Sequence, residues 1–291
     1  GIEKESFFAG AKVLKVPGYL EIAGRPDTKE KREKEDGDGE ENNPKNSAAL
    51  LKLADSLKEG DTAEVKEFLV KLVRAGYNIF ISGGTGSGKT TFLNALSQYI
   101  PKDERIITIE DNAELRILDI PNLVTLEARC ANLEGTGEIT IRELIRTALR
   151  MRPNRIIVGE VRGAEAIDML QALNTGHDGS LSTGHANSPK DMLSRLESMV
   201  LMGMDLPLGA VQRQIASGID IIVHLGRLRD KSRKVLEVSE ILDYQDGEIL
   251  VSPLYRFEET GEKDGKIQGT WRKMDDLVHT QKLLAAGYKE V

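Results

Sequence analysis

The stretch NIFISGGTGSGKTTFLNAL, residues 78–96, combines an apolar strand pattern, a glycine-rich turn and an apolar helical pattern in that order. We expect a buried strand over 78–82 and a helix that begins at Lys89. The four glycines between them allow the backbone to turn its N–H groups inward, and the start of the helix adds the positive end of its dipole. A strand, a turn and a helix of this kind are typical of a loop that binds nucleotide phosphates.

The residue types in this turn fit MgATP. Lys89 is expected to reach the β- and γ-phosphates, and the hydroxyl of Thr90 is expected to bind Mg²⁺. The alternative, a glycine-rich turn that binds nothing, is disfavoured because the full motif lies between a strand and a helix. The residues expected to contact ATP are Gly83, Gly84, Thr85, Gly86, Ser87, Gly88, Lys89, Thr90 and Thr91.

Apolar runs and helical patterns alternate along the middle of the chain. Beyond residues 78–96, strands are expected over 105–109, 155–158 and 219–225, and helices over 65–73, from Thr140, around 164–173, and near 189–200 and 207–217. Glu143 completes a capping box with Thr140, and a polar loop is expected to run through Ser182. This alternation predicts an α/β fold with a mainly parallel sheet covered by helices.

Three regions follow from these patterns. Residues 27–46 are almost wholly charged or polar and have no apolar periodicity, which is typical of a flexible linker. After residue 226 the pattern changes to short alternating runs separated by turn signals such as Asp246-Gly247, which predicts a small antiparallel appendage, and residues 274–288 are expected to form a terminal helix. The predicted regions are an N-terminal arm and charged linker (1–46), the core (47–226) and the C-terminal β appendage with its helix (227–291).

Composition narrows the function classes. The 291 residues are 40% hydrophobic, enough for a sizeable core, and their net charge of −7 offers no overall attraction to nucleic acid or anionic lipid. A single cysteine, Cys130, excludes an internal disulfide and fits a reducing, cytosolic setting. No stretch approaches the roughly 18 apolar residues of a spanning helix, and no signal-peptide pattern occurs at the start. Membrane contact is therefore expected to be peripheral.

Carboxylates follow two of the expected strands. The run IIVGE ends at Glu160, and the run IITIED ends at Glu110 and Asp111, with Glu114 shortly after. An acid beyond the carboxyl end of a central strand can order Mg²⁺ or orient water for hydrolysis. On spacing alone, solvated loop acids remain the alternative for the second group.

The chain resembles the secretion ATPases of type II, type IV pilus and type IV secretion machines, and the resemblance covers residues 62–242. Four motifs occur in the order of that family and resemble its Walker A motif, aspartate box, Walker B variant and histidine box: the loop at 83–90, TIEDNAE at 108–114, IIVGEVRG at 156–163 and TGHDGSLSTGHANS at 175–188. Residues 174–202 are most similar to the CpaF-like (TadA) branch, which drives tight-adherence (Flp) pilus assembly. The resemblance implies a RecA-like P-loop NTPase core.

Residue roles also follow from the resemblance. It implies that Glu114 is the general base that orients the attacking water, that Glu160 is the acid associated with Mg²⁺, and that Glu110 and Asp111 support them. His177 and His185 lie in the histidine box, which in the family adjoins the γ-phosphate and the neighbouring subunit. A nucleotide-sensing role and a purely structural role both remain open for these histidines, whose spacing does not match a zinc site.

Arginines recur along the helix expected from Thr140. Arg146 and Arg150 lie four residues apart on one face, with Arg142 and Arg152 nearby, and Arg129 precedes them. Most such arginines are solvated, but an arginine inserted into a neighbouring subunit's ATP site would stabilise transition-state charge. Arg146 and Arg150 are the candidates for that contact.

The resemblance implies a motor that hydrolyses ATP to ADP and phosphate as a ring, expected to be a hexamer, bound to an inner-membrane platform protein at the cytoplasmic face of the membrane. Family members carry a substantial N-terminal domain, and the short, charged start of this chain is expected to be a truncated version of it. Three alternatives stay open: a nucleic-acid translocase, disfavoured by the acidic charge and the single Trp; a nucleotide-gated scaffold that does not hydrolyse ATP; and a metabolite kinase, for which no acceptor motif is present.

Overall fold

The computed structural model describes residues 61–289, so the predicted arm and linker at 1–46 lie outside the described residues. The elements in chain order are α2 (Asp61–Arg74), β1 (Ile79–Gly83), α3 (Lys89–Ser97), β2 (Arg105–Glu110), β3 (Asn122–Glu127), α4 (Ile141–Leu149), β4 (Arg155–Val158), α5 (Ala166–Leu173), β5 (Leu181–Gly184), α6 (Pro189–Gly203), α7 (Leu208–Gly218), β6 (Ile221–Arg227), β7 (Arg233–Gln245), β8 (Glu248–Lys263), β9 (Lys266–Lys273) and α8 (Gln281–Ala285).

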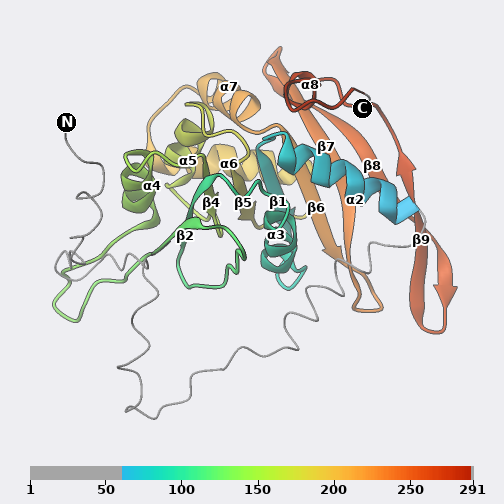
Figure 1. The fold of residues 1–291 in the computed structure, drawn as a ribbon, viewed down its shortest axis with the longest axis horizontal. Coiled ribbons are helices and arrows are strands. Elements are labelled where there is room, and N and C mark those ends of the chain that lie inside the picture. Colours follow the sequence, from blue (N-terminus) through green and yellow to red (C-terminus); the bar gives the residue numbers. More distant parts are fainter. Residues whose placement is uncertain (1–60, 290–291) are drawn as a thin grey trace, which may run out of the picture.

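One nine-stranded sheet runs through the molecule in the order β3-β2-β4-β5-β1-β6-β7-β8-β9 (Figure 1). Strands β3, β2, β4, β5, β1 and β6 pair with their neighbours in parallel. Strands β7, β8 and β9 extend the sheet beyond β6 in antiparallel fashion. Parallel neighbours that are not consecutive in sequence require crossover connections, and the helices supply them. The predicted α/β fold class, a mainly parallel sheet with C-terminal antiparallel strands, is confirmed.

Helices cover both faces of the parallel part because its strands are apolar on both sides. Side chains alternate along β1, so that Ile79 and Ile81 pack in a core with α2 and α3, while Phe80 packs in a second core with α4, α5, α6 and α7. Figure 1 shows α4 and α5 grouped at one end of the molecule, apart from α2 and the long antiparallel strands. The sheet therefore separates two hydrophobic cores.

Local signals set the start of two helices as expected. Thr140 caps α4 in a capping box: its hydroxyl accepts from the amide of Glu143, whose carboxylate accepts from the amide of Thr140 at 2.9 Å. Ser188 caps α6 by accepting from Asp191 N, and Pro189 occupies the first helical position, where a missing N–H costs nothing.

The expectation of a polar loop through Ser182 is wrong. Residues 181–184 form β5, a fully buried strand between β4 and β1. Its polar side chains find partners inside the sheet, since the Thr183 hydroxyl donates to the carbonyl of Gly159 at 2.7 Å. At Gly184 a Cβ atom would lie 2.9 Å from the ring of Phe80, so the close packing of β5 against β1 requires a residue without a side chain. Strand β3, on the outer edge, had no expectation at all.

The antiparallel strands are longer than the sequence predicts. Where short runs were expected, residues 248–263 form one long strand, β8, which passes through Pro253 where its pairing with β7 shifts register. The strand tolerates a proline there because a bulge leaves one residue without a ladder hydrogen bond. These strands continue the core sheet through β6, and the expected terminal helix over 274–288 is reduced to the short α8.

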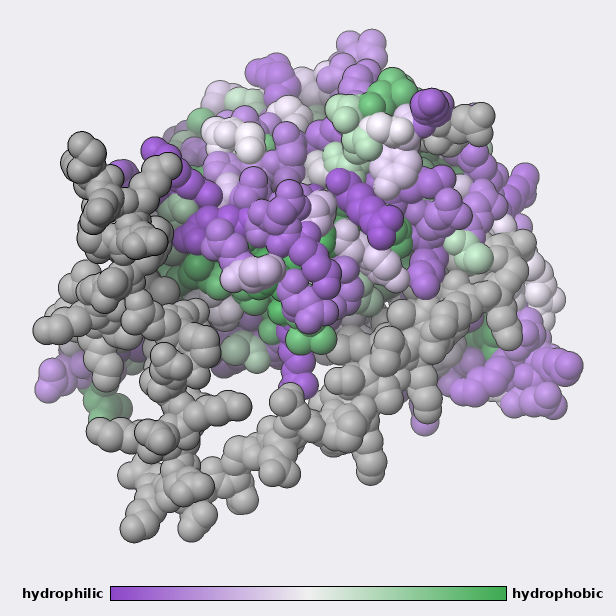
Figure 2. All heavy atoms as spheres, viewed as in Figure 1, coloured by the Kyte–Doolittle hydropathy of each residue, from purple (hydrophilic) through white to green (hydrophobic). Residues whose placement is uncertain are grey.

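The surface seen in Figure 2 is mainly hydrophilic, with smaller hydrophobic areas between the hydrophilic residues. Among the described residues, every helix is too short or too polar to cross a lipid bilayer.

Candidate functional site

Four groups of predicted site residues lie at or just beyond the ends of strands that meet at one edge of the sheet. Strands β2, β4, β5 and β1 are mutually parallel neighbours, so their carboxyl ends meet. The acidic loop, residues 110–114, begins at the last residue of β2, Glu160 lies shortly after β4, and His185 follows β5. The loop from Gly83 to Thr90, called the phosphate loop below, begins at the last residue of β1. Parallel pairing thus brings together residues that are up to about a hundred positions apart.

The phosphate loop has the backbone of an anion cradle. A Cβ atom at Gly83 would lie 2.5 Å from the carbonyl oxygen of Leu225, so this residue must be glycine for β1 and β6 to approach. Gly88 caps α3 with φ 93°, a left-handed conformation that favours glycine. Apart from the adjacent residues, no atom of residues 61–289 lies within 4 Å of the positions where side chains would project from Gly84 and Gly86, so this side of the loop is open to a phosphate group.

Lys89 lies inside the loop with only 7% of its surface exposed. Its Nζ donates to the carbonyls of Gly83 at 3.1 Å and Gly84 at 3.4 Å, and it lies 3.2 Å from Nδ1 of His185. Burial lowers the pKa of Lys89; nearby Arg162 lowers it further, and Glu160 opposes the shift. A cation is therefore held at the point where phosphate charge is expected.

His185 joins Lys89 to Glu160. Its Nε2 lies 2.7 Å from Oε1 of Glu160, and its Nδ1 faces the ammonium group of Lys89. Because an ammonium group can only donate, Nδ1 must accept, which leaves the ring proton on Nε2, beside the Glu160 carboxylate. Burial and the charge of Lys89 lower the pKa of His185, in agreement with a neutral ring.

Arg162, for which no role was predicted from the sequence, binds the other oxygen of Glu160. Its guanidinium donates to Oε2 of Glu160 at 2.7 Å and lies 3.5 Å from Asp111. Burial alone would raise the pKa of Glu160, but the hydrogen bond from Arg162 and the positive charges around it outweigh burial and lower that pKa. Arg162 lies within the IIVGEVRG motif at 156–163, so the sequence showed that it is near Glu160 but not that the two side chains bind each other.

Glu110 anchors the acidic loop. It is 4% exposed, and its Oε1 accepts from the backbone amides of Glu114 at 3.0 Å and Leu115 at 2.8 Å. Burial raises the pKa of Glu110, and the two amides partly oppose this. The side chain of Glu114 is exposed, so Glu110 holds the backbone beneath Glu114 while the Glu114 carboxylate stands in solvent.

The structure places His177 away from the phosphate loop of its own chain, and its predicted contact with a nucleotide stays a prediction. His177 precedes β5, and the neighbouring amides of Gly179 and Ser180 donate to the side chain of Asn78 at the amino end of β1. The phosphate loop follows the opposite end of this five-residue strand, roughly 15 Å away at the usual rise per residue. His177 and His185 share a motif in sequence but lie at opposite edges of the sheet.

The candidate arginines of α4 lie away from the phosphate loop. Arg146 and Arg142 both donate at 2.6 Å to the buried carboxylate of Asp168 on α5. Arg150 ends α4 and is exposed. Within residues 61–289 neither Arg146 nor Arg150 contacts the phosphate loop, and their action on a neighbouring subunit stays a prediction.

Two further residues contact the phosphate loop or the residues beside the site motifs. Arg233, the first residue of β7, donates from Nε to the carbonyl of Gly86 at 2.9 Å. His224 on β6 lies 2.9 Å from the hydroxyl of Ser82, the residue before the phosphate loop, and its ring also hydrogen-bonds the backbone of Asn187 near the end of the histidine box. Both residues come from strands whose neighbours only the sheet order reveals.

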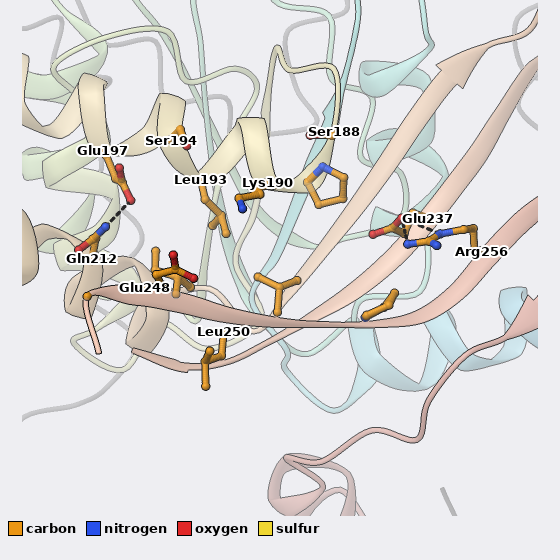
Figure 3. A pocket seen from close by; sticks show the side chains of 15 residues that line it. Ser188, Lys190, Leu193, Ser194, Glu197, Gln212, Glu237, Glu248, Leu250 and Arg256 are labelled. Carbon is orange, nitrogen blue, oxygen red and sulfur yellow. Dashed lines mark hydrogen bonds and ion pairs between the residues drawn. The ribbon is translucent and has the colours of Figure 1, made fainter. Parts of the chain in front are cut away.

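A groove of about 670 Å³ lies elsewhere, between α6 and the β7–β8 hairpin (Figure 3). Two polar contacts lie along its walls, from Gln212 on α7 to Glu197 on α6 at 3.0 Å and from Arg256 on β8 to Glu237 on β7 at 3.0 Å. None of the phosphate-loop residues lines it, so it is separate from the phosphate loop, although Ser188 at the end of the histidine box lines one part of it.

Comparisons with known proteins agree with the motif order. A family model described as "Type II/IV secretion system protein" matches residues 46–270. A putative conjugal transfer protein of Mycobacterium tuberculosis is 46% identical over 61% of this chain and 50% of its own length, and the type IV secretion system protein PtlH of Bordetella pertussis is 42% identical over 62% and 54%.

A solved structure shows the same fold: the VirB11 ATPase from the Brucella suis type IV secretion system, in complex with sulphate, has a TM-score of 0.55 and 36% identity over 66% of this chain and 55% of that one. The chain spans about half the length of the curated relatives it matches.

Proposed function

Because the chain belongs to the type II/IV secretion system protein family, we propose that it binds MgATP at the phosphate loop and hydrolyses it to ADP and phosphate. The contact chain from Lys89 through His185 to Glu160 carries this proposal. It sets a cation, a neutral imidazole and a carboxylate side by side at the carboxyl edge of the sheet, where a nucleotide binds in α/β folds.

The loop residues divide the binding work. The open amides of the loop and Lys89 hold the phosphates, and the Thr90 hydroxyl with Glu160 holds Mg²⁺. Both oxygens of Glu160 already contact side chains, so Glu160 acts on the metal through water. Bound Mg²⁺ supplies charge neutralisation on the phosphates.

Glu114 is proposed as the general base because it combines exposure with a fixed backbone. Its side chain reaches solvent, and the buried carboxylate of Glu110 holds its amide at 3.0 Å. A base must meet the attacking water while its own position stays constant. Glu110 and Asp111 therefore act as positioning residues, Glu110 on the backbone and Asp111 on Arg162.

The cellular role proposed is that of a ring-shaped motor, a hexamer, peripheral at the cytoplasmic face of the inner membrane, that powers pilus assembly or protein secretion through a membrane platform protein. Tight-adherence pilus assembly is the pathway favoured by the sequence pattern of residues 174–202. In such a ring Arg146 and Arg150, at the exposed side and end of α4, face outward to a neighbouring subunit.

Steady-state hydrolysis tests the site. Lys89→Ala and Glu160→Gln are each expected to lower the Mg²⁺-dependent kcat by at least about 100-fold, because each removes a charge from the reacting phosphates or their metal. Lys102→Ala and Glu258→Gln are matched controls, since both residues form exposed ion pairs elsewhere. Full turnover in both site variants would contradict the assignment.

A nucleic-acid motor is the second candidate, favoured by the similarity to the Mycobacterium tuberculosis relative, a putative conjugal transfer protein. It predicts that single-stranded DNA raises the ATPase rate with a strong dependence on salt. An ATPase rate that DNA leaves unchanged excludes it. If a single-turnover measurement finds no hydrolysis while nucleotide changes the oligomeric state, the protein is a nucleotide-gated scaffold instead.

A further inference from the structure

We infer that Arg233 is a nucleotide-contacting residue, supplied by the antiparallel part of the sheet, that donates to the phosphate groups of a nucleoside diphosphate or triphosphate at the phosphate loop. This inference rests on the proposed function and extends it to a residue outside the four sequence motifs.

Strand pairing brings Arg233 to the loop. Strand β6 runs parallel to β1, with Gly83 opposite Leu225, and ends at Arg227 on the same edge as the phosphate loop. The chain then turns back, and Arg233 opens β7 opposite Arg227. The antiparallel extension therefore begins beside the phosphates' expected position.

The side chain of Arg233 lies along the loop. Its Nε donates to the carbonyl of Gly86 at 2.9 Å, and its Cδ lies 3.2 Å from the place where a Cβ atom of Gly88 would stand. Any larger residue at 88 would press on this side chain. Gly88 therefore leaves room for the Arg233 side chain, and it also adopts the left-handed conformation that the turn requires.

The charge of Arg233 is not neutralised by a carboxylate of the described residues, which favours contact with an anion. In the part of the chain that the structure describes, Arg233 has no carboxylate partner, and its two terminal NH₂ groups make no hydrogen bond. Nearby arginines are differently engaged: Arg162 binds Glu160, and Arg229 of the same turn binds Glu259 and Glu262. A guanidinium with free donors beside an anion-binding loop matches the oxygens of a phosphate group.

Nucleotide binding measured without turnover tests the inference. The full chain is titrated with a fluorescent MgADP analogue, and unlabelled MgADP, a non-hydrolysable MgATP analogue and inorganic pyrophosphate are used as competitors. Arg233→Ala is expected to raise the Kd of each about tenfold or more, as the loss of a charge-assisted hydrogen bond does. Arg233→Lys keeps the positive charge but loses the planar guanidinium with its paired donors, so its Kd values should lie between those of the unaltered protein and those of Arg233→Ala.

Two variants separate the possible roles. Arg233→Gln keeps a donor for Gly86 but loses the charge, so binding like that of the unaltered protein would show a loop-shaping role and overturn the inference. Arg229→Ala removes a guanidinium from the same turn and should leave each Kd unchanged.

The competitors and the unaltered protein complete the test. If Arg233→Ala weakens MgADP but not pyrophosphate, the guanidinium acts on the base, and the phosphate contact is overturned. If the unaltered protein binds no nucleotide, the proposed function fails too. If it binds and Arg233→Ala binds equally well, only the inference fails.

Discussion

Single residues of the site act through their neighbours rather than alone. Lys89, which the motif identifies, is held by two backbone carbonyls and by His185, so it must exchange these partners to reach a phosphate. His185 ties that exchange to Glu160, because the same ring contacts both residues. The motif order predicted this group, but its contacts depend on rotamers and distances that no spacing contains.

His224 makes the stability of the protein depend on pH. The ring is 7% exposed, and burial lowers its pKa, although Glu237, the Asn187 backbone and Asp191 oppose the shift. Unfolded chains bind a proton here below about pH 6.5, whereas the folded chain resists it. The contribution of His224 is therefore complete above that pH and is lost as the pH falls below it.

Urea unfolding at pH 7.5 and 5.5 measures this effect. The unaltered protein is expected to lose stability at the lower pH, and His224→Gln, which retains hydrogen-bonding groups without titrating, is expected to lose less. The difference between the two proteins isolates the ring from the other titrating groups, such as His185. Parallel losses in both proteins would contradict the prediction.

At the scale of elements, Asp168 ties α4 to α5. It is 3% exposed and accepts from Arg142 and Arg146 at 2.6 Å each. Asp168→Ala is expected to cost about 2–3 kcal/mol in the free energy of unfolding, below the full cost of breaking a buried pair because both arginines can regain water. Urea unfolding measures the cost.

The exposed pair of Arg272 and Glu258 provides the control. Glu258→Ala should cost no more than about 1 kcal/mol, as surface ion pairs do. Equal costs for the two variants would mean that Asp168 is no tie between the helices.

Elements differ in how far their sequence reveals them. The strand and helix around the phosphate loop and the capped start of α4 follow from local patterns of apolar and capping residues. Strand β5 escaped because Ser182, Thr183 and Gly184 are typical of a loop, and their place in the sheet depends on partners such as Gly159 and Phe80. Burial between two strands overrides local propensity.

For the whole molecule, the shared sheet predicts that the core and the antiparallel strands unfold together. Trp271, the only tryptophan, lies on β9 against Phe257, with ring centroids 5.8 Å apart, so its fluorescence reports the far edge of the sheet. The urea transition followed by this fluorescence is expected to coincide with that followed by far-UV circular dichroism. An earlier fluorescence transition would mean that the antiparallel strands form a separate unit.

A core variant sharpens this test. Val238 on β7 is fully buried in the core that also contains Ile81 of β1. Val238→Ala should lower both transitions together by about 1–3 kcal/mol, whereas the exposed Thr270→Ala on β9 should change neither.

The sequence by itself determined the class of the protein: the phosphate loop, the alternation of strands and helices and the order of four motifs are all local patterns, readable without knowledge of contacts. The tertiary structure alone decided which of those residues meet. Parallel pairing collects His185, Glu160 and Lys89 at one edge, leaves His177 at the other, and brings Arg233 to Gly86 from 147 residues away. The physical reason is that strand order and burial are long-range properties, which depend on the packing of the whole chain.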